Sequence, residues 1–134
     1  MASALFELPS RTLVSGEKNL NLSRPILMGI LNSTPDSFSE DSSFFEFDDA
    51  LAQARKIIAE GADWLDIGGE SSGPGSTEVP LEEELRRVIP LIKEVRSESD
   101  IWISVDTWKA EVARQSLDAG ADAVNDVSAL RADK

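Results

Sequence analysis

The run Met28-Gly-Ile-Leu-Asn-Ser-Thr-Pro-Asp-Ser-Phe38 changes from apolar to polar within a few residues. Ile26 to Leu31 is a short apolar stretch, which is typical of a buried parallel strand. Asn32 opens the polar loop that follows, and we expect this loop to extend from Ser33 to Phe47. A buried strand that runs into a polar loop is the unit on which parallel α/β proteins build their functional sites.

Three further apolar stretches end in the same way. Strands are expected at residues 64–67, 101–105 and 123–125. The polar runs that overlap or follow them are Asp66-Ile-Gly-Gly-Glu-Ser71, Ile103-Ser-Val-Asp-Thr107 and Asn125-Asp-Val127. The chain therefore repeats one pattern four times.

Helices are expected between these strands. Asp48 can cap a helix that ends at Gly61, and a third helix is expected at 109–119 with Gly120 as its stop. Pro80 and the acidic residues after it mark the start of the middle helix, which Pro90 should kink. The apolar face of this helix is expected at Leu81, Leu85, Val88, Ile89, Ile92 and Val95. Four strands and three helices predict a parallel α/β fold.

The chain divides into two parts. Residues 1–24 are expected to form an N-terminal leader with a small hairpin, and residues 25–134 to form the regular domain. The segments Gly61-Ala-Asp-Trp-Leu-Asp66 and Gly120-Ala-Asp-Ala-Val-Asn125 share a layout. They indicate either an internal repeat of two strand-helix units or two similar helix-to-strand joints, each needing a left-handed glycine.

Composition limits the chemistry. The net charge is −12, from 25 acidic against 13 basic residues, so neither a nucleic acid nor an anionic membrane is an expected partner. Cysteine and histidine are absent, which excludes disulfides, thiolate sites and imidazole bases. Carboxylates and amides remain, so Mg²⁺ is a plausible ion. No signal-like or membrane-spanning run is present, and we expect a cytoplasmic protein.

Polar residues at the carboxyl ends of the four strands form the candidate site. Asn32, Gly68 to Ser72, Asp106 and Asn125 fall at these ends, which face one mouth in a strand-helix barrel. A carboxylate accepts paired N–H donors, and an amide both donates and accepts. This set can hydrogen-bond a flat heterocycle such as a pterin.

Each of these features also has a simpler interpretation. Asp106 can be a helix N-cap, and Asn32-Ser-Thr-Pro35 can be only a turn. The glycines at 68, 69, 73 and 75 resemble a phosphate-binding loop, but their spacing matches neither the G-x-G-x-x-G nor the Walker pattern. The triplet Glu82 to Glu84 fits a solvated helix start better than a metal site. Trp64 and Trp102 are expected in the core.

Taken together, the four motifs resemble dihydropteroate synthases in order and spacing. The resemblance implies the N-terminal half of a (β/α)₈ TIM barrel, in a transferase of folate biosynthesis. Such an enzyme condenses 6-hydroxymethyl-7,8-dihydropterin pyrophosphate with p-aminobenzoate and releases 7,8-dihydropteroate and pyrophosphate. A half sheet with open edges indicates association, for instance as a homodimer, instability or a missing remainder.

The resemblance also assigns roles to residues. It places Asn32 near Mg²⁺ and pyrophosphate, and makes Asp106 and Asn125 the partners of the pterin ring. Phe38 and Pro74 would wall the aminobenzoate pocket. Loops at 33–43 and 71–76 would close over the reacting carbon. The remaining expected catalytic and substrate-binding residues are Asp36, Glu40, Ser72 and Val127.

Three positions depart from the family pattern. Gly73 stands where the family has an arginine, Glu40-Asp-Ser42 replaces Asp-Gly-Gly, and Ser33 replaces an apolar residue. Loss of a guanidinium removes a bidentate anion partner. Two other functions therefore stay open: a non-catalytic half barrel that binds a pterin or a protein, and a methyltransferase that uses methyltetrahydrofolate.

Overall fold

The structure is a computed structural model that describes residues 11–33, 43–70 and 77–133. In chain order the elements are β1 (Thr12–Ser15), β2 (Lys18–Asn21), β3 (Met28–Asn32), α1 (Ser43–Ala59), β4 (Trp64–Gly68), α2 (Leu81–Glu98), β5 (Trp102–Asp106), α3 (Ala110–Ala119) and β6 (Ala123–Asn125). The parallel α/β class, with four parallel strands and three helices, is confirmed.

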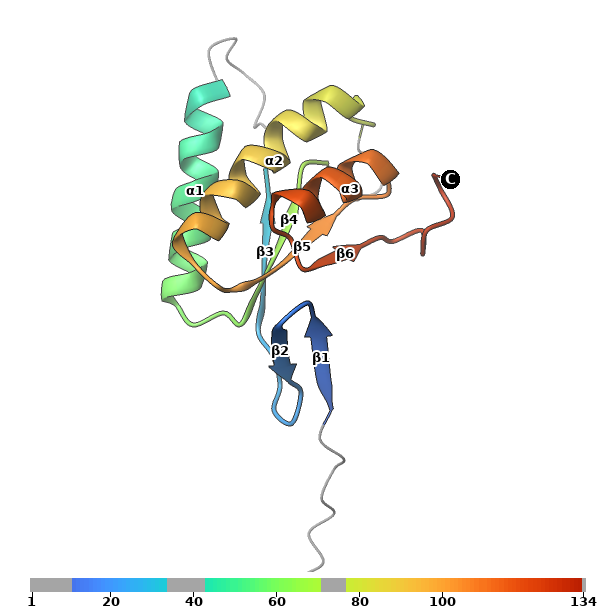
Figure 1. Cartoon of the computed structure of the whole chain (residues 1–134). Helices are drawn as coiled ribbons and strands as arrows, with labels where there is room; N and C mark the ends of the chain where they lie inside the picture. The colour runs from blue at the N-terminus through green and yellow to red at the C-terminus, as the bar shows by residue number, and fades with distance from the viewer. Residues whose placement is uncertain (1–10, 34–42, 71–76, 134) are drawn as a thin grey trace, which may run out of the picture.

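The main sheet has the order β3-β4-β5-β6, and all its strands run parallel (Figure 1). Its register aligns residues into rows across the strands. Asn32, Gly68, Asp106 and Asn125 pair in succession and form the row at the carboxyl ends. Two rows earlier, and so on the same face of the sheet, Asp66 pairs with Ile30 on one side and with Ser104 on the other.

One face of the sheet packs against the helices. Leu65 and Ile67 of β4 are fully buried, as are Ile103 and Val105 of β5. They join Leu31 and the buried residues of α1, α2 and α3 in a single core cluster. In α1 these are Ala50, Leu51 and Ala54, which repeat at helical spacing. Because strand side chains alternate, the residues between them face the opposite side of the sheet.

That opposite face carries no helix in the described part of the chain. Met28 and Ile30 of β3 are 47% and 66% exposed there. Trp64 stacks on Trp102 with ring centroids 5.2 Å apart. The expected core position is confirmed for Trp102, which is 7% exposed, whereas Trp64 is only partly buried.

A two-stranded antiparallel hairpin, β1 with β2, lies at the amino-terminal ends of the parallel strands (Figure 1). Lys18 Nζ donates to Ile101 O at 3.2 Å and to Asp122 Oδ2 at 2.9 Å. Ser15 Oγ donates to Asp122 O at 3.1 Å. Both acceptor residues lie just before strands of the main sheet, so the hairpin closes the end opposite to the candidate site.

The expected start of the first helix is wrong. The polar loop was expected to reach Phe47 with Asp48 as cap, but α1 begins at Ser43 and contains both residues. Phe47 lies four residues before Leu51 and packs against the core cluster. The apolar face therefore extends one turn further toward the N-terminus, and burial of this face outweighs a good capping residue.

The face assigned to α2 is partly wrong. Leu81 is 36% exposed, whereas Leu91 is fully buried together with Val88, Ile92 and Val95. Glu84 is 1% exposed, so the acidic triplet is not wholly a solvated helix start. The helix runs through Pro90 without ending there, and the expected kink stays a prediction. Glu84 occupies the core-facing stripe because its partners come from other elements.

The two glycine-alanine-aspartate segments make equivalent joints. Gly61 and Gly120 have φ angles of 98° and 119°, which an L side chain rarely adopts. Asp63 accepts a hydrogen bond from Leu27 N at 3.0 Å, and Asp122 accepts one from Ile103 N at 2.9 Å. Each aspartate thus binds a backbone amide near the start of the preceding strand in the sheet, which gives the shared layout a physical reason.

Candidate functional site

The candidate site is the row of residues at the carboxyl ends of β3 to β6. Asn32 and Asn125 are exposed at its two sides, and Asp106 is partly buried between them. Asp106 and Asn125 are direct register partners in neighbouring parallel strands. Three polar side chains expected from the sequence therefore lie at one edge of the sheet, on adjacent strands. Asp106 does not cap α3, whose N-cap residue is Lys109.

Gly68 lies in this row between Asn32 and Asp106. A Cβ at this position would lie 3.2 Å from Asn32 Oδ1 and 3.4 Å from Asp106 Cβ. The first distance is tighter than ordinary packing and the second is an ordinary van der Waals contact, so an alanine would crowd the Asn32 amide. The absence of a side chain leaves the space between the Asn32 amide and the Asp106 carboxylate open, which a flat ligand would need.

A second polar layer lies directly beneath the row. Asp66 and Ser104 are 3% and 1% exposed, and Ser104 Oγ donates to Asp66 Oδ1. Asn125 Nδ2 donates to Asp66 Oδ2 at 3.1 Å. Neither Asp66 nor Ser104 was expected from the sequence to have a role in the site. The available signal was a polar residue at the centre of each of two otherwise apolar strands.

The environment of Asp106 disfavours its charged form. Burial raises the pKa of this carboxyl, and the nearby carboxylates of Asp66, Glu84 and Asp126 raise it further. Burial withdraws hydration from a charge, and like charges repel it. A ligand that brings N–H donors to this carboxylate would therefore stabilise its charged form.

A buried ionic cluster lies behind the site. Lys109 Nζ donates to Glu84 Oε2 and to Glu70 Oε2, each at 2.6 Å. Thr107 Oγ1 donates to Glu84 Oε1 at 2.7 Å. The pKa of Lys109 is raised, because hydrogen bonds to the two glutamates outweigh the lowering that burial causes. This cluster joins the end of β4, the start of α2 and the segment after Asp106.

Several expected site residues lie outside the described part of the chain. These are Asp36, Phe38, Glu40, Ser72 and Pro74. Val127 is described and is 72% exposed, in the turn after β6. The assignments of all the site residues stay predictions, and the structure adds the register that aligns Asn32, Asp106 and Asn125.

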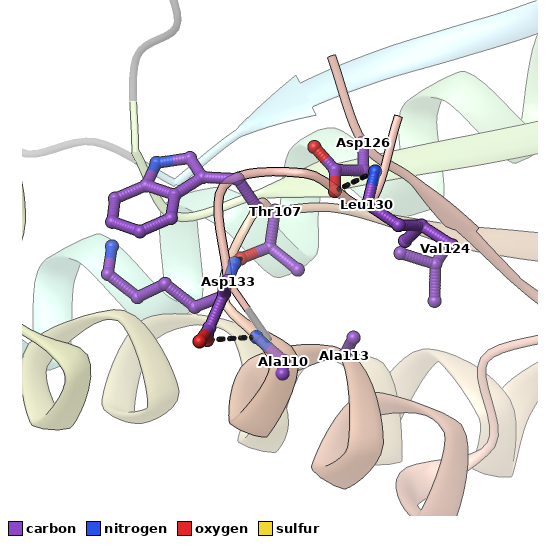
Figure 2. A pocket seen from close by; sticks show the side chains of 9 residues that line it. Thr107, Ala110, Ala113, Val124, Asp126, Leu130 and Asp133 are labelled. Atoms are coloured by element: carbon purple, nitrogen blue, oxygen red, sulfur yellow. Dashed lines mark hydrogen bonds between the residues drawn. The ribbon is translucent and has the colours of Figure 1, made fainter. Parts of the chain in front are cut away.

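A small cavity lies beside the start of α3 and is shown in Figure 2. Thr107, Val124 and Asp126 are among the residues that line it, and its volume is about 40 Å³. Asp133 Oδ2 accepts a hydrogen bond from Ala110 N at 2.8 Å across one side (Figure 2). Ligand pockets typically measure about 300 Å³ or more, so this cavity has room for water but not for a pterin.

The described residues contain no group of three or more acidic, histidine or cysteine side chains that could hold a metal ion. Asn32 is exposed and its amide oxygen is a hard ligand. Mg²⁺ commonly takes one or two protein oxygens together with substrate phosphates. Asn32 therefore fits a magnesium ion that arrives with a phosphorylated substrate. In the described ranges no helix is long and apolar enough to cross a membrane.

The geometry agrees with comparisons to known proteins. A family model described as pterin binding enzyme matches residues 28–134. The chain belongs to this family. This member is 50% identical over 119 residues to the dihydropteroate synthase of Haemophilus influenzae, covering 89% of this chain and 43% of that protein. It is also 54% identical over 105 residues to the Synechocystis enzyme of the same name, covering 78% of this chain and 36% of that enzyme.

Solved structures extend the similarity to the fold. The Xanthomonas albilineans dihydropteroate synthase with 4-aminobenzoic acid superposes with a TM-score of 0.84 at 50% identity, covering 92% of this chain and 45% of that one. The Burkholderia cenocepacia enzyme complexed with 7,8-dihydropteroate superposes with a TM-score of 0.78 at 48% identity, covering 91% of this chain and 40% of that one. The resemblance inferred from the motifs is thus confirmed. The chain spans less than half the length of the curated relatives it matches.

Proposed function

We propose that this family member contributes the pterin-binding strands of a dihydropteroate synthase. The observation that carries the proposal is the row formed by Asn32, Gly68, Asp106 and Asn125, which are successive register partners. The row combines one carboxylate, two amides and an open gap at the functional end of a parallel sheet.

Asp106 and Asn125 are proposed to bind the pterin ring. One edge of a pterin presents an amino group and a ring N–H side by side, and a carboxylate accepts such a pair well. Asn125 can accept a further N–H through its amide oxygen. Desolvation strengthens these bonds, because Asp106 is already partly withdrawn from water.

Asn32 is proposed to face the pyrophosphate and its Mg²⁺. When bound, the ion would neutralise part of the charge that develops on the leaving group. Asn32, on the strand at one side of the row, is separated from the ring-binding residues by Gly68. The ring would therefore bind at β5 and β6, and the leaving group at β3.

In the proposed reaction the amine nitrogen of p-aminobenzoate attacks the methylene carbon attached to the pterin. The bond from this carbon to oxygen breaks as the carbon–nitrogen bond forms. Pyrophosphate leaves with the electron pair, and the nitrogen loses one proton. The protein's task is to hold the ring and to exclude water, which would compete as the nucleophile.

The proposal is tested by supplying both substrates to the protein purified as its own cell makes it. We expect 7,8-dihydropteroate and pyrophosphate in equal amounts, with neither formed when p-aminobenzoate is omitted. Binding of the dihydropterin without product would overturn the synthase proposal in favour of a non-catalytic pterin-binding protein. Methyl transfer from methyltetrahydrofolate to a corrinoid would overturn it in favour of a methyltransferase.

A further inference from the structure

Asp66 is a buried carboxylate that the proposed reaction does not use. It lies at the centre of β4, on the sheet face without helices, and is 3% exposed. Its Oδ2 accepts a hydrogen bond from Asn125 Nδ2 at 3.1 Å. Asn125 itself is exposed at the mouth, so Asp66 connects the buried layer to a residue that a ligand can reach.

The other oxygen of Asp66, Oδ1, accepts a hydrogen bond from the buried Ser104 hydroxyl. Trp64 Nε1 donates to Ser104 Oγ at 2.8 Å. The single proton of the Ser104 hydroxyl is then directed to Asp66 Oδ1. Ser104 is 1% exposed and has no room to turn toward water. The donors thus converge on Asp66, which accepts from Ser104 at one oxygen and from Asn125 at the other.

This arrangement determines which way the Asn125 amide faces. A carboxylate can only accept hydrogen bonds, so the group that approaches Asp66 Oδ2 must be the NH₂ of the amide. The carbonyl oxygen of Asn125 is consequently left for the ligand. A reversed amide would place two acceptor oxygens against each other inside a poorly hydrated layer, which is strongly unfavourable.

The burial of a carboxylate at Asp66 has no evident structural benefit. In the described part of the chain its hydrogen-bonding partners are the neutral groups of Ser104 and Asn125, and no ion pair includes it. Burying a carboxylate without a cation costs free energy. Its low exposure also separates it from a ligand, so any effect on binding must pass through a neighbour.

We propose that Asp66 is a positioning residue that fixes the orientation of the Asn125 amide and so makes the site an acceptor of ligand N–H groups. This inference rests on the proposed function to the extent that Asn125 contacts the pterin. It predicts selectivity for ring edges that donate hydrogen bonds over edges that accept them at this position.

The first test is the isosteric change Asp66→Asn. An asparagine can present either an oxygen or an NH₂ to Asn125, so the Asn125 amide loses its fixed orientation. We expect the affinity for 6-hydroxymethyl-7,8-dihydropterin, measured by calorimetry, to fall about tenfold. Asp63→Asn is the matched control before the same strand, at the opposite end from the site, and should leave this affinity unchanged. Thermal unfolding followed by circular dichroism checks that both variants fold.

The second test separates positioning from general damage. In an Asn125→Ala background, at a pH well above the binding midpoint of Asp106, Asp66→Asn should change the affinity by less than about twofold, because the residue through which it acts is gone. A full tenfold loss in that background, or an unchanged affinity of the single Asp66→Asn variant, would overturn the inference.

The third test needs no ligand. The side-chain ¹⁵N–¹H signals of Asn125 report the hydrogen bond to Asp66, and Asp66→Asn should move them whereas Asp63→Asn should not. Unmoved signals would overturn the inference. Failure of the unsubstituted protein to bind the dihydropterin would instead contradict the proposed function, and the amide signals would still decide the role of Asp66.

Discussion

The Asp106 carboxylate has a protonation state that both the fold and a ligand influence. Burial, followed by repulsion from Asp66, Glu84 and Asp126, raises its pKa in the folded chain. Relative to the unfolded chain, ionised Asp106 therefore opposes folding. This penalty is fully present above the raised pKa and is relieved as the pH falls below it. Ligand binding should have the opposite dependence, because only the ionised form accepts two N–H donors.

The first prediction concerns the pH dependence of pterin binding. The affinity for 6-hydroxymethyl-7,8-dihydropterin should fall as the pH drops through the pKa of Asp106, with a midpoint above the usual aspartate range. Calorimetry across the acidic range measures this midpoint. Asp66→Asn should lower the midpoint, since it removes a charge that raises the pKa. A midpoint at or below that of an ordinary aspartate would contradict this account of Asp106.

At the scale of single residues, the sequence predicted the site residues at the strand ends but not the buried polar residues next to them on the same face of the sheet. Asn32, Asp106 and Asn125 were predictable because each follows an apolar run, and parallel strands bring their carboxyl ends to one edge. Asp66 and Ser104 were not, because their pairing depends on the register between two strands 38 residues apart. Alternation within one strand indicates which face a residue takes, but not which residue of the neighbouring strand lies beside it.

At the scale of elements, the cluster formed by Glu70, Glu84, Thr107 and Lys109 connects three segments. Glu84 comes from α2, Glu70 follows β4, and Lys109 precedes α3. The Lys109 side chain is 9% exposed, and its ammonium group forms ion pairs with both carboxylates of this cluster. Its ammonium group thus compensates charges that the core would otherwise exclude.

The second prediction is that Lys109→Met lowers the free energy of unfolding by about 3–5 kcal/mol, because two buried or nearly buried carboxylates lose their cation. Urea unfolding measures the change. Lys56→Met is the matched control, because Lys56 is 71% exposed and lies 4.0 Å from Glu60. It should change stability by less than about 0.5 kcal/mol. Equal effects of the two substitutions would show that the cluster does not stabilise the fold.

The sequence predicted the presence of the helices and strands better than it predicted which of their residues are buried. All three helices and all four parallel strands were expected, because apolar periodicity and terminal glycines identify them. The early start of α1 and the burial of Glu84 were not. Both depend on what other elements supply, namely a core surface for Phe47 and a cation for Glu84.

At the scale of the whole molecule, the two ends of the parallel strands have separate tasks. The carboxyl ends carry the candidate site, and the amino ends carry the hairpin and its contacts. Asp122 accepts hydrogen bonds from Lys18 Nζ at 2.9 Å, Arg96 Nη2 at 2.8 Å and Ile103 N at 2.9 Å. In barrels of this type the amino-terminal face contributes to stability and the carboxyl face to chemistry.

The third prediction separates these tasks. Asp122→Ala should lower the free energy of unfolding by about 2 kcal/mol, since it removes three hydrogen bonds to one carboxylate, and it should leave dihydropterin affinity unchanged. Asp106→Asn should lower the affinity and raise or preserve the stability. Unfolding curves and calorimetry on both variants test the pattern. If Asp122→Ala weakened binding as much as Asp106→Asn, the two ends would not be independent.

The most direct test of the proposed function is the rate of 7,8-dihydropteroate formation by the protein as its own cell makes it, compared with its Asp106→Asn variant. The account predicts that the unsubstituted protein forms product from both substrates, and that the variant is slower by about 10- to 100-fold, because a paired N–H edge loses its charged acceptor. An equal rate in the variant would contradict the assignment of the strand-end row as the pterin site. No product from either protein would contradict the synthase function itself.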